Sequence, residues 1–241
     1  MDIRGWVRTS LIDFPGHIAT VLFTGGCDFR CPMCHNADLV LKPGALPAVA
    51  PEDVWRFLSQ RQGKLTGVVV TGGEPTLQPD LGDFLRAVQD LGYAAKLDTN
   101  GYRPDVLGRL LEARLLDYVA MDIKAPPEDY ARLAGLPDLD LARIETSIEL
   151  LCQGDISYEF RTTVVPGLLK DDDIDAIARW LACKGDRATV RYHLQQFRSL
   201  HTLDPALASA VPYTVQRLQE MASRARRWLD RVSVRGIGSD E

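Results

Sequence analysis

The chain has 241 residues, with 28 Lys and Arg against 33 Asp and Glu, and a formal net charge of −5. This length is enough for one large domain or two small ones with a substantial core. The mildly acidic balance excludes an overall electrostatic attraction to nucleic acid or to an anionic membrane. No apolar run approaches the roughly 20 residues that span a bilayer, and the first residues lack the apolar core of a signal peptide. We therefore expect a cytoplasmic protein with neither nucleic acid nor a membrane as its partner.

Apolar, β-rich runs recur along the chain and predict six strands. They cover residues 18–24, 67–71, 94–98, 118–123, 158–164 and 189–194, and residues 232–235 favour a short terminal strand. Several of these runs are almost continuously apolar, which is typical of strands covered on both faces of a parallel sheet.

Helical patterns fill the intervals between these strands. They cover residues 51–62, 80–91, 104–116, 139–153, 171–183 and 212–229, the last being the longest, and residues 42–51 resemble a loop. Consecutive β–α units build a parallel sheet with helices outside it, and a complete eight-unit barrel takes about 250 residues. The sequence therefore predicts an incomplete, open (β/α)6 TIM-like barrel, with a flat doubly wound sheet as the alternative. Since no linker or repeat interrupts the chain, residues 1–241 are expected to form a single domain.

Polar motifs follow the ends of the predicted strands, where ligands bind in parallel α/β folds. A cysteine cluster follows the first strand, Gly-Gly-Glu-Pro at 72–75 follows the second, and Asp-Thr-Asn-Gly at 98–101 closes the third. Asp122 with Lys124, Arg161 and His193 lie within or at the ends of the later strands. This recurrence predicts one binding site at the carboxyl ends of the strands.

The cysteine cluster is the most specific of these motifs. Cys27, Cys31 and Cys34 form a C-x3-C-x2-C spacing in a chain that shows no sign of export, so a disulfide framework is not expected. Three thiolates this close favour a [4Fe–4S] cluster, which normally takes four ligands and would here keep one iron open. A zinc site completed by His35 and a redox pair of Cys31 and Cys34 are the alternatives. Zinc is disfavoured because structural zinc sites usually draw on two separated ligand pairs.

The two other cysteines lie far from this cluster. Cys152 and Cys183 occupy apolar helical stretches and are expected to be packing residues. No cysteine lies between residues 37 and 72.

A family resemblance follows from these motifs. C-x3-C-x2-C after a first strand and Gly-Gly-Glu-Pro after the second resemble the radical S-adenosylmethionine (SAM) superfamily. SLIDFPG at residues 10–16 and Cys34-His35-Asn36 resemble the activating enzymes of glycyl radical proteins, most narrowly those of anaerobic ribonucleoside-triphosphate reductase. The resemblance implies one radical SAM domain over residues 1–241, a [4Fe–4S] cluster and SAM as cofactors, and a flavodoxin- or ferredoxin-type electron donor. It also implies reductive cleavage of SAM and removal of a hydrogen atom from a glycine of the partner enzyme.

The resemblance also implies roles for the residues near the cysteines. Cys27, Cys31 and Cys34 would be the catalytic cluster ligands. Gly72 and Gly73 would let the backbone approach SAM, and Glu74 would accept a hydrogen bond from its ammonium group. Met33 stands where the superfamily usually has an aromatic residue and would pack against the adenine. His35 and Asn36 would flank the adenine or ribose, with helix capping as the alternative for Asn36.

Further site residues are implied on the later strands. Asp98, Thr99, Lys124, Arg161 and His193 would line the cofactor site, with Lys124 and Arg161 neutralising the methionine carboxylate and His193 donating a hydrogen bond to it. Asp98 and Asp122 would hold a monovalent cation through hard oxygen ligands. The structural alternatives are helix caps for Asp98 and Thr99, a surface pair of Asp122 with Lys124, and a core histidine at 193.

Residues 10–16 precede the first predicted strand, and we expect them to contribute to a docking rim for the partner. Two other functions stay open from the sequence. A radical SAM enzyme acting on a small molecule, like 7-carboxy-7-deazaguanine synthase, would keep the chemistry and change the substrate. A zinc-stabilised, non-catalytic binding module would carry out no reaction.

Overall fold

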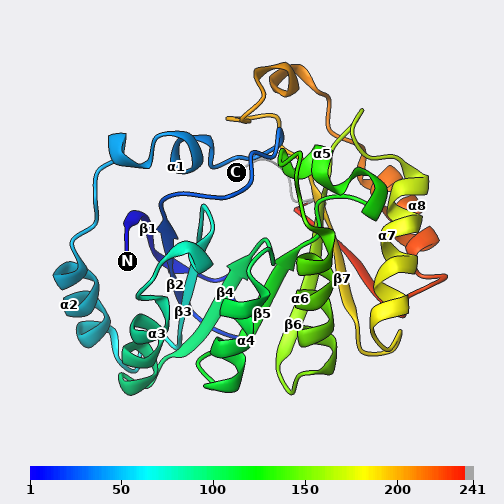
Figure 1. Cartoon of the computed structure of the whole chain (residues 1–241). Coiled ribbons are helices and arrows are strands. Elements are labelled where there is room, and N and C mark those ends of the chain that lie inside the picture. Colours follow the sequence, from blue (N-terminus) through cyan, green and yellow to red (C-terminus); the bar gives the residue numbers. More distant parts are fainter. Residues whose placement is uncertain (237–241) are drawn as a thin grey trace. The chain divides into compact units, whose positions relative to one another are not determined.

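The computed structural model describes residues 1–236 (Figure 1). Within these residues, eight strands form a sheet in which each strand lies beside its neighbours in sequence, in the order β1 to β8. β1 pairs antiparallel with β2, whereas the pairs β2–β3, β3–β4, β6–β7 and β7–β8 are parallel. The strands are β1 Ile3–Ser10, β2 Ala19–Thr24, β3 Gly67–Gly72, β4 Ala94–Thr99, β5 Tyr118–Asp122, β6 Ser157–Val164, β7 Arg191–Gln196 and β8 Arg231–Arg235.

Helices follow most of the parallel strands. The longer ones are α2 Pro51–Arg61, α3 Leu81–Asp90, α4 Pro104–Glu112, α6 Leu141–Gln153, α7 Asp171–Lys184 and α8 Val215–Ala225. Shorter helices are α1 Ala37–Leu41 and α5 Tyr130–Ala134, with 3-10 turns at Pro43–Ala45, Pro75–Leu77, Pro127–Asp129 and Pro205–Ser209. Proline opens α2 and α4, where its missing N–H removes no helical hydrogen bond. In α3 the buried residues Leu81, Leu85 and Val88 recur at helical spacing, and this helix lies against β4.

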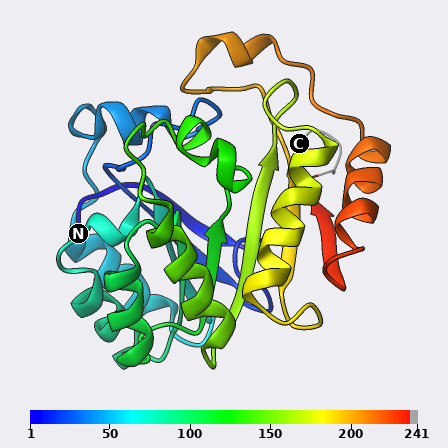
Figure 2. The ribbon, with the colours of Figure 1, turned by 45° about the vertical axis from the view of Figure 1, so that its right-hand side comes forward.

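The chain is built from two compact units. The N-terminal unit comprises Met1–Asp28 and Asn36–Ala120, and the C-terminal unit comprises Phe29–His35 and the chain from residue 121 onward. A core of the N-terminal unit gathers Phe14, Ala19, Val21, Val69, Tyr118 and Ala120. In the C-terminal unit α7 and α8 lie side by side (Figure 2). That all 241 residues form one domain stays a prediction.

The alternation of strands and helices is confirmed, and several details differ from expectation, among them the short helices α1 and α5, which were not predicted. The sequence missed β1, because its alternating polar residues suit an edge strand and give no apolar run. The α8 helix has 11 residues and is shorter than α7, which has 14. It begins at Val215 and not at residue 212, because Thr214 is its N-cap, and it ends at Ala225. The expected loop at 42–51 contains the 3-10 turn Pro43–Ala45.

Residues 10–16 connect β1 to β2, and their contribution to a docking rim for the partner stays a prediction. Ser10 ends β1 and pairs with Ala19 at the start of β2, so the segment joins the two strands at the amino end of β2. Cys27 follows the carboxyl end of that same strand. The side chain of Phe14 is buried against the amino ends of the strands, whereas Ile12 is 89% exposed. The segment therefore closes the sheet at the end opposite Cys27.

Candidate cofactor-binding site

The loop before Cys27 packs directly on the Gly-Gly-Glu-Pro loop of the N-terminal unit. The backbone N–H of Gly73 donates to Thr24 O at 2.8 Å, and that of Glu74 donates to Gly26 O at 2.7 Å. A Cβ on Gly73 would lie 1.9 Å from Gly26 O, and Gly72 has a φ of +118° with its Cβ position 2.3 Å from the nitrogen of Thr24. These two glycines are therefore required by the contact between two protein loops, a reason that the sequence did not supply.

Glu74 is fully buried and joins the ends of β3 and β4. Its Oε1 accepts hydrogen bonds from the backbone N–H of Thr76 at 3.1 Å, the Thr76 hydroxyl at 2.5 Å and the Thr99 hydroxyl at 2.8 Å. Its Oε2 accepts from the backbone N–H of Asn100 at 2.7 Å. Burial raises the pKa of this carboxyl, and the hydrogen bonds from Thr76, Asn100 and Thr99 oppose the shift. Four protein donors thus hold Glu74, and its contact with the SAM ammonium stays a prediction.

The sequence did not predict a group of polar contacts next to Cys27, here called the bracket, which consists of Asp28, Asn100, Tyr102 and Arg103. The Asn100 side-chain amide donates to Asp28 Oδ1 at 2.8 Å and lies 3.9 Å from the Cys27 sulfur, while its Oδ1 accepts from the N–H of Tyr102 at 2.9 Å. Arg103 Nε lies 3.3 Å from Asp28 Oδ2. The Asn-Gly pair at 100–101, directly after a strand, was the available signal for this bracket.

Asn36 does not cap α1 through its side chain, and its contact with the adenine or ribose stays a prediction. It precedes α1 without a side-chain capping hydrogen bond, and its amide donates to Gly72 O at 2.9 Å. It therefore attaches the residues after the cysteine motif to the end of β3.

Cys31 and Cys34 lie on one turn of the C-terminal unit. The N–H of Cys34 donates to Cys31 O at 3.0 Å, and the N–H of Arg30 donates to Ala134 O at 2.8 Å. Gly135 follows with a φ of +63°, and its Cβ position would lie 2.2 Å from Arg30 O, so only glycine fits there. The helix α5 is thereby packed beneath the turn. Burial raises the pKa of the Cys31 thiol to about 11, although the Lys124 ammonium opposes the shift.

A segment after β7 supports the same turn. The N–H of Leu203 donates to Cys34 O at 3.0 Å, and the N–H of Asp204 donates to Pro32 O at 2.9 Å. The His35 ring contacts Arg198 O at 2.6 Å and stacks on Phe197 with 5.9 Å between ring centroids. This support could not be predicted from the sequence, because more than 160 residues separate the two segments.

Four predicted site residues gather in the C-terminal unit. Asp122 accepts from Lys124 Nζ through Oδ2 and from Arg161 Nε through Oδ1, both at 2.9 Å. Burial raises the pKa of Asp122, but the two cations outweigh it and hold this pKa at about 2, and Asp122 raises the pKa of Lys124. With Met33 and Thr163 these residues line a cavity of about 20 Å³, room for about one water molecule. Thr163 was missed, and its alternation with Arg161 along β6 was the signal.

Both predicted cation ligands already have cationic neighbours. Asp98 Oδ1 accepts from Lys96 Nζ at 2.6 Å, and Asp122 lies between Lys124 and Arg161. Across residues 1–236, no group of three or more His, Cys, Asp and Glu side chains is arranged to hold a metal ion. The cation and the joint ligation of one cluster by the three cysteines therefore stay predictions.

His193 has partners that the sequence did not predict. Its Nδ1 lies 2.6 Å from the Ser233 hydroxyl and its Nε2 lies 3.0 Å from an Arg235 nitrogen. Arg235 in turn donates to both carboxylate oxygens of Glu159.

The chemistry of the cysteine side chains fits a thiolate-bound group. None of Cys27, Cys31 and Cys34 forms a disulfide. An amide donor from Asn100 lies near the sulfur of Cys27, and the Lys124 ammonium acts on Cys31. Amide donors and cations are the neighbours that stabilise a sulfur ligand once it is deprotonated.

The remaining cysteines differ from each other. Cys152 is partly buried and accepts from the Tyr158 hydroxyl at 3.6 Å, whereas Cys183 is exposed. The expectation that Cys183 is a packing residue is wrong, because Trp180 and Leu181 take the buried face of α7 and Cys183 falls on the other face.

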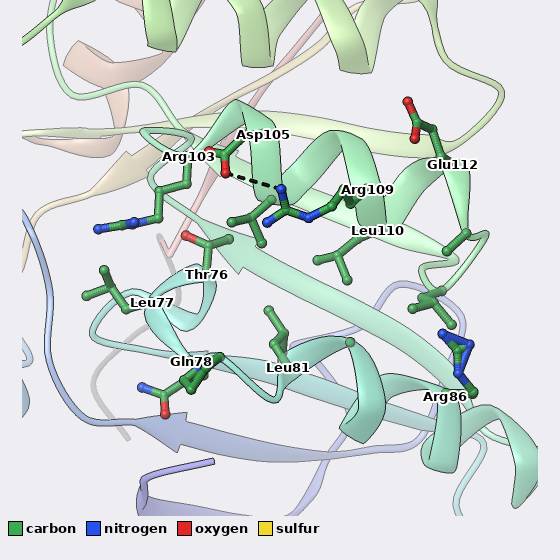
Figure 3. A pocket seen from close by; sticks show the side chains of 15 residues that line it. Thr76, Leu77, Gln78, Leu81, Arg86, Arg103, Asp105, Arg109, Leu110 and Glu112 are labelled. Carbon is green, nitrogen blue, oxygen red and sulfur yellow. Dashed lines mark hydrogen bonds and ion pairs between the residues drawn. The ribbon is translucent and has the colours of Figure 1, made fainter.

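A larger cavity of the N-terminal unit lies between α3 and α4 and has a volume of about 790 Å³ (Figure 3). Its walls carry Arg86, Arg103 and Arg109 together with Leu81 and Leu110. None of the site residues predicted from the sequence lines it. Over residues 1–236, no helix is long and apolar enough to cross a membrane.

Comparison with known proteins identifies the family. A model of the radical SAM superfamily matches residues 21–181. The chain is 29% identical over 240 residues to a Methanocaldococcus jannaschii protein assigned to the glycyl-radical enzyme activating enzymes, a match covering 98% of this chain and 96% of that protein. It is 33% identical over 183 residues to the pyruvate formate-lyase 1-activating enzyme of Escherichia coli, covering 71% of this chain and 70% of that enzyme.

Solved structures share the fold. SuiB of Streptococcus suis, bound to its precursor peptide, matches with a TM-score of 0.64 at 16% identity over 90% of this chain and 48% of SuiB. A domain of a Bacteroides vulgatus pyruvate-formate lyase-activating enzyme matches with a TM-score of 0.55 at 18% identity over 71% of this chain and 99% of the domain. The predicted fold class, a parallel α/β sheet of the incomplete TIM-like barrel type, is confirmed. The chain belongs to the radical SAM superfamily and, within it, to the activating enzymes of glycyl-radical enzymes.

Proposed function

We propose that the partner of this activating enzyme is an anaerobic ribonucleoside-triphosphate reductase, in which it converts one glycine to a glycyl radical. The proposal is carried by SLIDFPG at residues 10–16 and Cys34-His35-Asn36, which resemble the activating proteins of that reductase. The absence of cysteine between residues 37 and 72 supports a short activase with one cluster.

The proposed cofactors are one [4Fe–4S] cluster and SAM, which the family implies, with a cation between Asp98 and Asp122 as a further proposal. Cys27, Cys31 and Cys34 would hold the cluster and leave one iron for SAM. When bound, these cofactors supply the one-electron cleavage of a sulfonium and a radical able to take a hydrogen atom from carbon. A flavodoxin- or ferredoxin-type protein is proposed as the electron donor, and the cytoplasm as the location.

The remaining site residues are proposed to bind and orient SAM. The Met33 side chain offers a buried, polarisable surface for the adenine. Lys124 and Arg161 both pair with Asp122, and their two positive charges would attract an anionic group such as the methionine carboxylate. Gly72 and Gly73 would let the backbone approach SAM, Glu74 and Thr99 would also line its site, and His35 and Asn36 would flank the nucleoside.

The test is a radical assay with a panel of partners. The reconstituted enzyme, SAM and a reductant are mixed anaerobically with an anaerobic ribonucleoside-triphosphate reductase or with pyruvate formate-lyase. Electron paramagnetic resonance should record a glycyl radical with the reductase and none with a Cys31→Ala enzyme. A signal with pyruvate formate-lyase alone would overturn the choice of partner. No signal with any partner, despite SAM cleavage, would favour a small-molecule substrate.

A further inference from the structure

A polar cluster on β6, β7 and β8, built around the buried Glu159, determines the chemical form of His193. The register aligns Arg161 with His193 and His193 with Ser233, and it aligns Gln195 with Arg235. Because side chains alternate along a strand, Glu159, His193, Ser233 and Arg235 emerge on the same face of the sheet. The three strands thus assemble one cluster within the C-terminal unit.

Glu159 anchors this cluster. Its side chain is 1% exposed, and its two oxygens accept from the two terminal nitrogens of Arg235 at 2.7 and 2.8 Å. This two-point arrangement fixes the plane of the guanidinium as well as its position. A lysine at 235 would keep the charge and lose that plane.

The guanidinium then determines which ring nitrogen of His193 carries the proton. The Arg235 nitrogen that reaches His193 Nε2, at 3.0 Å, is a donor and cannot accept a hydrogen bond. Nε2 must therefore be the acceptor and carry no hydrogen. The single proton of the neutral ring lies on Nδ1, which donates to the Ser233 hydroxyl at 2.6 Å.

The other forms of the ring fit this cluster less well. A proton on Nε2 would face the N–H groups of Arg235, and its acceptor would be Glu159 at the longer distance of 3.4 Å. A doubly protonated ring would in addition place a positive charge against the guanidinium.

We propose that Arg235, held by Glu159, is a positioning residue that keeps His193 as the neutral Nδ1–H tautomer, so that the ring contributes a fixed, uncharged surface to the SAM site. The link to SAM rests on the proposed function, whereas the tautomer does not. Both ring nitrogens are engaged within the protein, so His193 holds no N–H in reserve for the methionine carboxylate. That contact falls to Lys124 and Arg161.

Nitrogen NMR of the histidine-labelled protein tests the tautomer directly. The chain has four histidines, and a His193→Gln variant assigns the resonances of the fourth ring. At neutral pH, His193 should show a protonated Nδ1 and an unprotonated Nε2. Arg235→Gln, Glu159→Gln and Ser233→Ala should each mix the two tautomers, while Ser233→Thr should preserve the wild-type pattern. The matched control is Arg187→Gln, which removes an exposed guanidinium paired with Asp230.

Two results would overturn the proposal. Finding the proton on Nε2 in the wild-type protein would exclude the tautomer assignment, and an unchanged pattern in Arg235→Gln would exclude the positioning role of Arg235. In the cluster-loaded enzyme, Arg235→Gln should weaken SAM binding by about tenfold, the effect of losing one good hydrogen bond. Mixed tautomers with unchanged SAM affinity would exclude the role in the cofactor site. The apo-protein NMR reports on the tautomer even if the radical assay fails with every partner, so the two failures are distinguishable.

Discussion

Single residues in this chain have two kinds of task, and Glu74 illustrates both. The sequence assigns it to a ligand, and the structure buries it under four donors from Thr76, Thr99 and Asn100. The Glu74 carboxylate can accept all four hydrogen bonds, whereas a glutamine amide has an NH2 donor in place of one of the two acceptor oxygens.

Glu74→Gln should therefore destabilise the apo protein. The new NH2 group of the glutamine would face at least one of the buried N–H and O–H donors that now bind Glu74. We expect a loss of about 2–3 kcal/mol in the free energy of unfolding. Urea unfolding of wild type and variant measures it.

The control for this variant is Glu112→Gln, an exposed glutamate at the end of α4, which should change the stability by less than about 0.5 kcal/mol. Unchanged apo stability of Glu74→Gln with impaired SAM binding would show that Glu74 serves the ligand alone.

Residue identities were predictable here, and their partners were not. Gly72, Gly73 and Glu74 stood out by motif, but the backbone that requires the glycines, at Thr24 and Gly26, comes from another strand end. The bracket of Asn100 on Asp28 joins residues 72 positions apart, and the hold of Arg235 on His193 spans 42 positions. Spacing rules address neighbours along one element, so contacts of this range are outside their reach.

The connection between β1 and β2 has a structural role, because it is a tight turn that buries Phe14. Ser10 bonds to Asp13 and receives the N–H groups of Ile12 and Asp13, which closes a tight turn. The turn directs Phe14 into the core against Val69 and Tyr118.

Phe14→Ala should cost about 3–5 kcal/mol of unfolding free energy, because it empties a buried ring volume. Ile12→Ser, two residues away with an 89% exposed side chain, should cost less than about 0.5 kcal/mol. Chemical denaturation of the two variants is the measurement. Equal losses would mean that the turn is not anchored through Phe14.

Ion pairs and hydrogen bonds join α7 to α8 and to the turn that follows α8. Asp175 accepts from Arg227 at 2.5 Å and from the Trp228 indole at 3.0 Å. Burial raises the pKa of Asp175, but these hydrogen bonds outweigh it and hold the pKa below its usual range. The three aspartates that open α7 were predictable as a helix start, whereas the pairing of Asp171 with Arg217 and of Asp172 with Arg224 on α8 required the fold.

Because the folded-state pKa of Asp175 is lowered, its stabilisation is complete above the unfolded pKa of about 4 and is lost as the pH falls below it. Asp175→Asn should therefore lower the stability by about 1 kcal/mol at neutral pH, and this difference should vanish in acid. Unfolding curves at several pH values follow it. Asp172→Asn, whose carboxylate is 91% exposed, is the control and should show a smaller difference throughout. A difference in unfolding free energy between wild type and Asp175→Asn that does not change with pH would contradict the lowered pKa of Asp175.

At the scale of the whole molecule, the three clustered cysteines are divided between the two compact units. Cys27 belongs to the N-terminal unit and Cys31 and Cys34 to the C-terminal unit. The order of β–α units and the motif positions were readable from the sequence because each depends on local periodicity. The division into two compact units was not, since it depends on which distant segments pack together.

Alanine at Cys27, Cys31 or Cys34 should each remove the bound iron and abolish SAM cleavage after anaerobic reconstitution. Alanine at Cys152 or at the exposed Cys183 should leave both at wild-type levels. Iron content and methionine release are the measurements, and full activity in any of the first three variants would exclude the cluster assignment.

The bracket at Asn100 has a consequence for the chemical ageing of the protein. Asn100 precedes Gly101, a pair in which the glycine nitrogen attacks the asparagine side chain readily once the chain is free to bend. In the fold that nitrogen donates to the Thr99 hydroxyl at 3.1 Å, and the amide is held by Asp28 and Tyr102. An unfolded chain has no such protection, and the aspartate that deamidation leaves would place a second carboxylate against Asp28, next to Cys27. Material that has passed through a long unfolded, alkaline step would regain its helices and strands with a damaged cysteine loop.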